Sequence, residues 1–150
     1  MATLAEVDVF QDFTPAGLER LTRLGRFRSL RTGEPLCRQG DGGGVMYVIL
    51  RGRVRTERAH PDLSEPVTVL ELGPGESVGE LGVLDLAPWP ATVTALDETE
   101  ALELSALLLA ETLLHYPVPA VGLLSSLSRS LRSLDDLETC VHQLRARPAM

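Results

Sequence analysis

The spacing of apolar residues predicts a short helix near the N-terminus. Its apolar positions recur at intervals of three and therefore share one face: Leu18, Leu21 and Leu24. Thr14 is a favourable N-cap, Pro15 suits the first helical position, and Gly25 follows the last apolar residue. We therefore expect a helix from about Pro15 to Leu24, with Gly25 as its stop.

Residues 26–104 have a different pattern, in which short β-favouring runs alternate with glycine, proline and aspartate. Four of these runs are expected to form strands: 45–50, 67–72, 91–96 and 102–104. Because no run with a helical period separates them, the pattern favours an antiparallel sandwich or roll over a parallel α/β sheet. The expected fold class is mainly β with flanking helices.

The helical period returns after Ser105. A first helix is expected over 106–116, and a second from Pro119 to about Arg145. The second helix carries an apolar stripe in steps of three and four residues: Leu124, Leu127, Leu131, Leu134, Leu137, Val141 and Leu144. Since such a stripe needs a partner surface, we expect it to be the dimer helix of a homodimer. The alternative is that it folds back on its own domain.

The length of 150 residues fits one domain with its own core. We divide this single domain into an N-terminal helical segment (1–25), a β-rich body (26–104) and C-terminal helices (105–147). The longest apolar runs fall far short of the ~20 residues that cross a bilayer, and the N-terminus lacks the basic and apolar regions of a secretory signal. We therefore expect a cytoplasmic protein with no membrane contact.

The net charge of −7 is concentrated in the second half of the chain. Residues 1–75 contain ten arginines and ten acidic residues, whereas residues 76–150 contain four arginines and eleven acidic residues. A phosphate backbone binds to a concentrated positive surface, so nucleic acid is not an expected partner.

The sequence contains no constellation typical of an enzyme or a metal site. The glycine-containing segments 40–44 and 73–79 lack the spacing of phosphate-binding and dinucleotide-binding loops, and both are predicted to be turns. No metal-ligand spacing relates the three histidines: His60, His115 and His142. The two cysteines are expected to be small buried residues or unreactive thiols: Cys37 and Cys140. We expect no catalytic residue and no metal. A cupin-type metal enzyme is an alternative function for a roll of this size, but it would need a closely spaced pair of histidines.

Three arginines alternate along an expected strand: Arg51, Arg53 and Arg55. Alternate residues of a strand point to the same face. We interpret them as part of a solvated sheet face, and an anionic partner surface is the alternative.

Four motifs of the β-rich body occur in a recognisable order. They are residues 30–36 (Leu-Arg-Thr-Gly-Glu-Pro-Leu), 39–41 (Gln-Gly-Asp), 47–54 (Tyr-Val-Ile-Leu-Arg-Gly-Arg-Val) and 73–81 (Gly-Pro-Gly-Glu-Ser-Val-Gly-Glu-Leu). Together they resemble the cyclic nucleotide-binding domain family, which includes the sensor domains of catabolite activator transcription factors and of protein kinase A regulatory subunits. The resemblance extends from about residue 10 to residue 132.

The resemblance implies an antiparallel β-roll, a double-stranded β-helix similar to a jelly roll, with an N-terminal helix and a long C-terminal dimerisation helix. Transcription factors of the family continue from the long helix into a helix-turn-helix. Since the expected long helix of this chain ends a few residues before Met150, we expect no DNA-binding domain.

In the family, a cassette between two strands holds the cyclic phosphate and the ribose, and the resemblance places it at residues 78–93. Gly79 matches the glycine whose backbone approaches the sugar, and Glu80 matches the carboxylate that accepts the ribose 2′-hydroxyl. Trp89 stands in place of the arginine that pairs with the phosphate, and Pro90 stands in place of a neighbour that donates a backbone N–H. The candidate residues of this degenerate cassette are Gly79, Glu80, Leu81, Trp89, Pro90, Ala91 and Thr92.

We therefore expect a non-enzymatic regulatory or sensor domain that needs no cofactor and does not bind cyclic nucleotides through the usual phosphate contact. It would act on a protein partner or bind a different small molecule. The side chain of Trp89 either fills the vacated pocket or lies on an apolar docking surface formed by residues 86–90, and the sequence leaves both open.

The alternative is a genuine cyclic AMP or cyclic GMP module. It would hold the nucleotide with Gly79 and Glu80. An arginine from elsewhere in the chain, such as Arg51 or Arg53, would then neutralise the phosphate.

Overall fold

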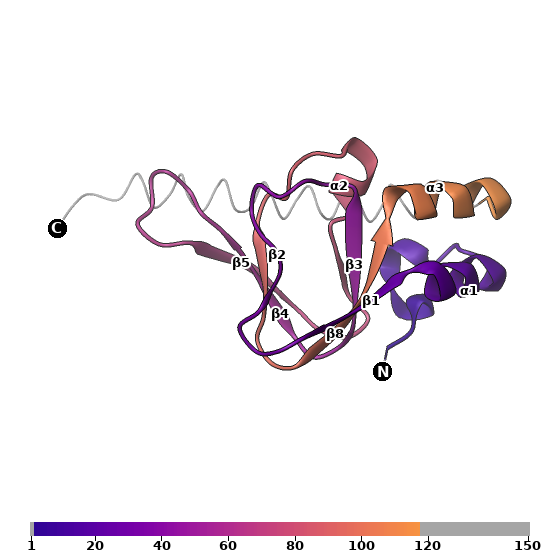
Figure 1. Cartoon of the computed structure of the whole chain (residues 1–150), viewed down its shortest axis with the longest axis horizontal. Helices are drawn as coiled ribbons and strands as arrows, with labels where there is room; N and C mark the ends of the chain where they lie inside the picture. Colours follow the sequence, from indigo (N-terminus) through magenta and orange to yellow (C-terminus); the bar gives the residue numbers. More distant parts are fainter. Residues whose placement is uncertain (1, 118–150) are drawn as a thin grey trace.

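The computed structural model describes residues 2–117 and shows a β-roll with helices at one end (Figure 1). One antiparallel sheet has the strand order β1-β8-β3-β6, made of Arg26–Leu30, Thr99–Ser105, Val45–Arg51 and Ser77–Val78. The other has the order β2-β7-β4-β5, made of Pro35–Cys37, Thr92–Ala95, Val54–Arg58 and Val67–Leu72. The predicted fold class, mainly β and antiparallel, is confirmed.

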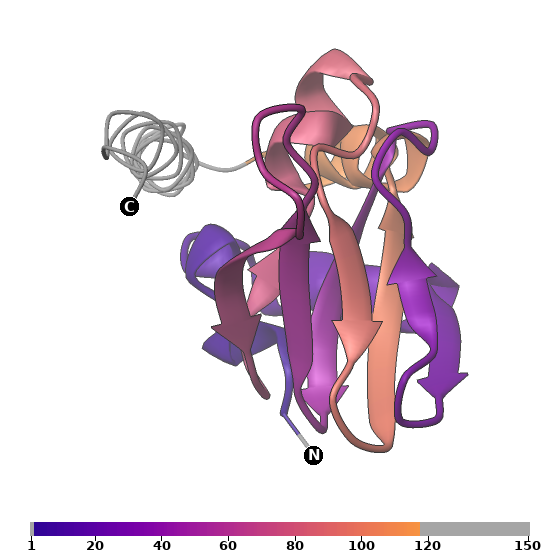
Figure 2. The ribbon, with the colours of Figure 1, turned by 90° about the vertical axis from the view of Figure 1, so that its left-hand side faces the viewer.

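Helices cover one end of the roll, and a shorter helix connects two of its strands. The helical elements are the 3-10 turns η1 (Leu4–Glu6) and η2 (Asp8–Phe10) and the helices α1 (Pro15–Leu24), α2 (Glu80–Asp85) and α3 (Ala106–His115). Helices α1 and α3 lie side by side and are joined by an ion pair between Arg20 and Glu111 at 3.4 Å. Helix α2 connects β6 to the loop before β7 and lies at one end of the strands (Figure 2).

The predicted N-terminal helix is confirmed with its predicted bounds. Its cap is the one expected, because the hydroxyl of Thr14 accepts a hydrogen bond from the N–H of Gly17 at 3.1 Å. Gly25 ends the helix for a different reason from the one expected. Its φ of −67° is open to any residue, but a Cβ there would lie 2.8 Å from the carbonyl oxygen of Leu21 and 2.9 Å from the side chain of Leu102. Glycine is therefore needed for space.

The four predicted strands are present as β3, β5, β7 and β8, and the helix predicted after them is α3. Four further strands were not predicted: β1, β2, β4 and β6. These strands are short or rich in charged residues, and they form because a neighbour supplies the hydrogen bonds. Strand β4, for example, pairs with β5 along one edge and with β7 along the other.

Two hydrophobic cores share strand β3. Met46, Val48 and Leu50 point into a core between the sheet and the helices, which also contains Phe10 and Leu21. The alternate residues of β3 point into a second core between the two sheets: Tyr47 and Ile49. Burial on both faces explains why this strand is an uninterrupted apolar run in the sequence.

Some predictions lie outside the described residues: the second C-terminal helix with its apolar stripe, Cys140 and His142. Cys37 is buried in the second core, as predicted. Within residues 2–117, no helix is both long enough and apolar enough to cross a lipid bilayer.

Candidate functional site

The cassette predicted at residues 78–93 begins with a glycine whose backbone no other residue adopts easily. Gly79 links β6 to α2 with a φ of +96°. A Cβ at this position would lie 2.5 Å from the Cη2 atom of Trp89 and 2.9 Å from the carbonyl oxygen of Val45. Gly79 is therefore required by its conformation and by the closeness of the indole ring.

The indole of Trp89 points into the roll. The residue is only 5% exposed and belongs to the core between the two sheets. Its ring lies against the backbone of Gly79 and has its centroid 5.7 Å from that of the Tyr47 ring, at an interplanar angle of 36°. Of the two orientations that the sequence left open, the structure has the inward one.

The residues around Trp89 face solvent instead. Leu86 is 63% exposed, and Ala87, Pro88 and Pro90 are also exposed. Leu86 has a φ of +58°, a left-handed conformation that is unusual for a leucine. The backbone thus turns sharply after α2 and returns with the tryptophan inward and both prolines outward.

The carboxylate of Glu80 already has a hydrogen-bond partner in the residue that precedes the cassette. The hydroxyl of Ser77 donates a hydrogen bond to the Oε1 atom of Glu80. Ser77 was not among the predicted site residues, and it is not the N-cap of α2, so no capping motif indicated this pair of side chains.

The other predicted cassette residues are Leu81, Pro90, Ala91 and Thr92. Leu81 lies within α2. Ala91 is half-buried, and Thr92 begins β7 and accepts a hydrogen bond from the N–H of Gln39 at 3.0 Å. The structure therefore brings Gly79 and Trp89 into contact and leaves Pro90 facing away from them.

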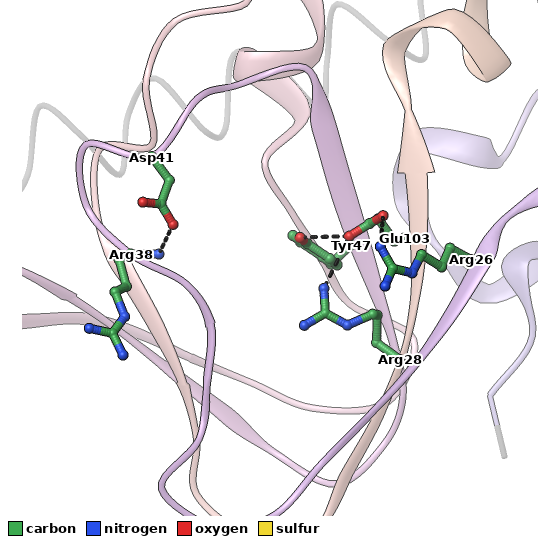
Figure 3. A network of polar contacts seen from close by, with 6 residues as sticks. All are labelled: Arg26, Arg28, Arg38, Asp41, Tyr47 and Glu103. Carbon is green, nitrogen blue, oxygen red and sulfur yellow. Dashed lines mark hydrogen bonds and ion pairs between the residues drawn. The ribbon is translucent and has the colours of Figure 1, made fainter.

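A polar network surrounds the hydroxyl of Tyr47 (Figure 3), whose ring lies beside that of Trp89. The hydroxyl of Tyr47 donates to Oε1 of Glu103 at 2.9 Å, and the guanidinium of Arg28 reaches the same oxygen at 3.2 Å. Arg26 lies 3.9 Å from the other oxygen of Glu103. Burial raises the pKa of Tyr47, and the hydrogen bond to the Glu103 carboxylate raises it further, so the phenol stays neutral. Arg28 is thus already paired, and sequence reasoning missed this network.

The three alternating arginines do not lie on one strand. Gly52, with a φ of +89°, forms a turn between β3 and β4 and separates Arg51 from Arg55. The arginines are paired with acidic residues: Arg51 with Glu100 at 4.0 Å, Arg53 with Glu71 at 3.6 Å, and Arg55 with Glu57. The expected one-sided array is therefore wrong, because the chain reverses direction within it.

The same turn places two of these arginines far from the cassette. The carbonyl of Val45, at the start of β3, lies against Gly79. Arg51 ends that strand six residues later, which corresponds to about 20 Å at the rise of an antiparallel strand. Arg51 and the nearby Arg53 therefore lie toward the end of β3 opposite to the one that contacts Gly79.

The site as a whole offers a backbone glycine, a carboxylate and an indole, and the indole fills the space beside the glycine. Among residues 2–117, no three histidine, cysteine or acidic side chains lie close enough together to hold a metal ion.

Comparison with known proteins relates this arrangement to a family. The family model described as "Cyclic nucleotide-binding domain" matches residues 27–116. The "Cyclic AMP receptor protein" of Thermus thermophilus is 36% identical over 103 residues, which are 69% of this chain and 47% of that protein. This chain therefore spans about half the length of that relative.

Two solved structures share the fold at 30% sequence identity. The N-terminal domain of a transcriptional regulator from Streptomyces coelicolor has a TM-score of 0.74, covering 91% of this chain and 95% of that one. The catabolite activator protein of Thermus thermophilus has a TM-score of 0.76, covering 91% and 63%.

Other relatives carry the matched region as a smaller part of a larger protein. It makes up 26% of a cyclic nucleotide-gated potassium channel from Mesorhizobium japonicum, 5% of a lysophospholipase from Aspergillus fumigatus and 28% of an acetyltransferase from Mycolicibacterium smegmatis. The family thus serves regulators, channels and enzymes. With the family model matching most of the roll and α3, the chain belongs to the cyclic nucleotide-binding domain family.

Proposed function

We propose that this chain is a regulatory module in which the protein's own Trp89 occupies the position that a cyclic phosphate would take. It would not bind cyclic nucleotides through the usual phosphate contact. The observation that carries this proposal is the buried indole, packed against the backbone of Gly79. Because Gly79 and Glu80 match the sugar-binding residues of the family, a ring at this place competes directly with a nucleotide.

The change from arginine to tryptophan removes affinity as well as space. A guanidinium offers a permanent charge and several N–H donors to an anion, whereas indole offers one neutral N–H. A phosphate placed beside the Glu80 carboxylate without a cation carries a penalty on the order of 3 to 5 kcal/mol. Pro90 removes a second donor, because proline has no backbone N–H.

The alternative of a substitute arginine finds no support from the residues first suggested for it. Arg51 and Arg53 are paired with Glu100 and Glu71 at the opposite end of β3. We therefore favour a module that acts through a protein partner or a different small molecule. We further propose that the whole chain is one such domain and that residues 120–145 join two copies of it.

Calorimetric titration of the native chain with cyclic AMP, cyclic GMP and cyclic di-GMP tests the proposed function. We expect no heat of binding at micromolar concentrations, because the phosphate would meet a carboxylate and an indole. Trp89 is the only tryptophan of the chain, so its fluorescence is a second, local readout. Micromolar binding of any of the three nucleotides, with a change in that fluorescence, would refute the proposal.

Substitution within the apolar stripe tests the proposed dimer. Leu131→Glu or Leu134→Glu places a charge where an apolar contact is expected, so a dimer should become a monomer in sedimentation experiments. Ser125→Glu, which would lie on the opposite side of the expected helix, is the matched control and should leave the mass unchanged. If the stripe variants keep the mass of the native chain, the stripe does not join two copies.

A further inference from the structure

We propose that the segment 38–44, here called the glycine loop, positions Trp89 inside the roll and couples it to helix α3. The sequence indicated only a turn at this place. The inference rests on the proposed function, since it concerns what keeps the indole in the nucleotide position.

The glycine loop holds the backbone of Trp89 from both sides. The N–H of Trp89 donates to the carbonyl of Asp41 at 2.8 Å, and the N–H of Gly40 donates to the carbonyl of Trp89 at 2.8 Å. The carboxylate of Asp41 in turn accepts a hydrogen bond from the N–H of Arg38 at 2.9 Å, which fixes the turn (Figure 3). These bonds set the depth at which the indole enters the roll.

A second set of contacts is steric and depends on one particular glycine. A Cβ at Gly43 would lie 2.0 Å from the carbonyl oxygen of Ala87 and 3.0 Å from the carbonyl carbon of Leu86. Backbone therefore packs directly on backbone, two and three residues before Trp89. Gly42, the preceding residue, has nothing within 4 Å of the corresponding position. The glycine loop therefore has no room for a side chain at Gly43 but has room for one at Gly42.

Gly44, the last residue of the glycine loop, connects the cassette to helix α3. The N–H of Gly44 donates to the carbonyl of Gly82 in α2 at 3.1 Å. The carbonyl of Gly44 accepts from the N–H of Ala106, the first residue of α3, at 2.8 Å. In Figure 1 the trace between β2 and β3 runs beside α2 before it enters the sheet. A single residue therefore bonds both to the cassette helix and to α3.

The loop is also tied to the rest of the roll, so it cannot follow Trp89 freely. The side chain of Gln39 makes two hydrogen bonds with the backbone of Ala59, at 2.8 Å and 3.3 Å. The backbone N–H of Gln39 binds Thr92, at the start of β7. Outward movement of Trp89 thus has to break or shift bonds of the glycine loop, and the shift reaches Ala106 through Gly44.

A pair of neighbouring variants tests this inference without any nucleotide. Gly43→Ala should push residues 86–87 away and move Trp89 toward solvent, so its emission should shift to the red and acrylamide should quench it several-fold more strongly. Gly42→Ala, in the same loop, should leave both values as they are in the native chain. Hydrogen exchange should also become faster at the first turn of α3 in Gly43→Ala alone.

The result that overturns the proposal is a folded Gly43→Ala protein, by circular dichroism, with native emission and quenching. The coupling to α3 would be overturned if Trp89 has moved in the variant but the amide hydrogen of Ala106 exchanges at the same rate as in the native chain. If Gly43→Ala does not fold, Asp41→Ala decides, because it removes only the bond from Arg38 and should give the same red shift. These measurements contain no nucleotide, so they are independent of the titration that tests the proposed function. Nucleotide binding would refute the proposed function without affecting the role of the glycine loop, and native fluorescence of Gly43→Ala would refute the role of the loop without affecting the proposed function.

Discussion

Replacing Trp89 by arginine and Pro90 by serine should give this chain measurable affinity for cyclic AMP. The substitutions restore a guanidinium and a backbone N–H where the family binds the phosphate, and they remove the ring that covers Gly79. Gly79, which matches the glycine of the family's sugar site, is already in place with a left-handed conformation. The expected gain of about 3 to 5 kcal/mol corresponds to an increase in affinity of about two to three and a half powers of ten.

Calorimetry of the double variant against the native chain measures this gain. Adding Glu80→Ala to the double variant should abolish the new affinity, because the ribose hydroxyl then loses its acceptor. The single variant Trp89→Ala, which opens the space without supplying a charge, should stay weak. A folded double variant that binds no cyclic AMP would show that the site differs from a nucleotide site by more than these two residues.

Replacing Trp89 by alanine should strongly destabilise the fold. A buried tryptophan replaced by alanine typically costs about 3 to 5 kcal/mol, because the apolar contacts are lost and a cavity remains. For a domain of this size, the midpoint of thermal unfolding should fall on the order of 10 °C. Urea unfolding followed by circular dichroism measures the loss, since this variant has no tryptophan fluorescence.

Leu86→Ala is the matched control for that experiment. Leu86 lies three residues earlier in the same loop but is 63% exposed, so its truncation should change the free energy of unfolding by less than about 0.5 kcal/mol. Equal effects of the two substitutions would contradict the view that the indole is a core residue of the roll.

The parts of the fold that the sequence predicted well are those whose stability is largely local. Helix α1 has its predicted bounds because Thr14 and Pro15 specify its start, and β3 was visible because both of its faces are buried. Strand β4 was missed because only Val54 and Thr56 point inward, while charged residues occupy the other face. Its strand character comes from two neighbours in the sheet, which no short window of sequence contains.

In the candidate site, too, the sequence located residues that are close together in the chain but not the contacts between distant segments. The resemblance located Gly79, Glu80 and Trp89, since these lie close together in the sequence. The direction of the indole depends on contacts with the glycine loop, about fifty residues earlier in the chain, and on the space beside Gly79. The network of Tyr47, Glu103 and Arg28 likewise joins three strands and leaves no local signal in the sequence.

Strand β3, which supplies alternate residues to two cores, restricts how this protein can change during evolution. Substitution of one apolar residue there by another of similar volume affects a single core and is tolerated best when its neighbours can adjust. Deletion or insertion of one residue would exchange the two sets of side chains, so that Tyr47 and Ile49 would face the helices and their neighbours would face Trp89. Apolar residues of similar volume can therefore replace one another in β3, whereas both cores fix the number of residues in the strand.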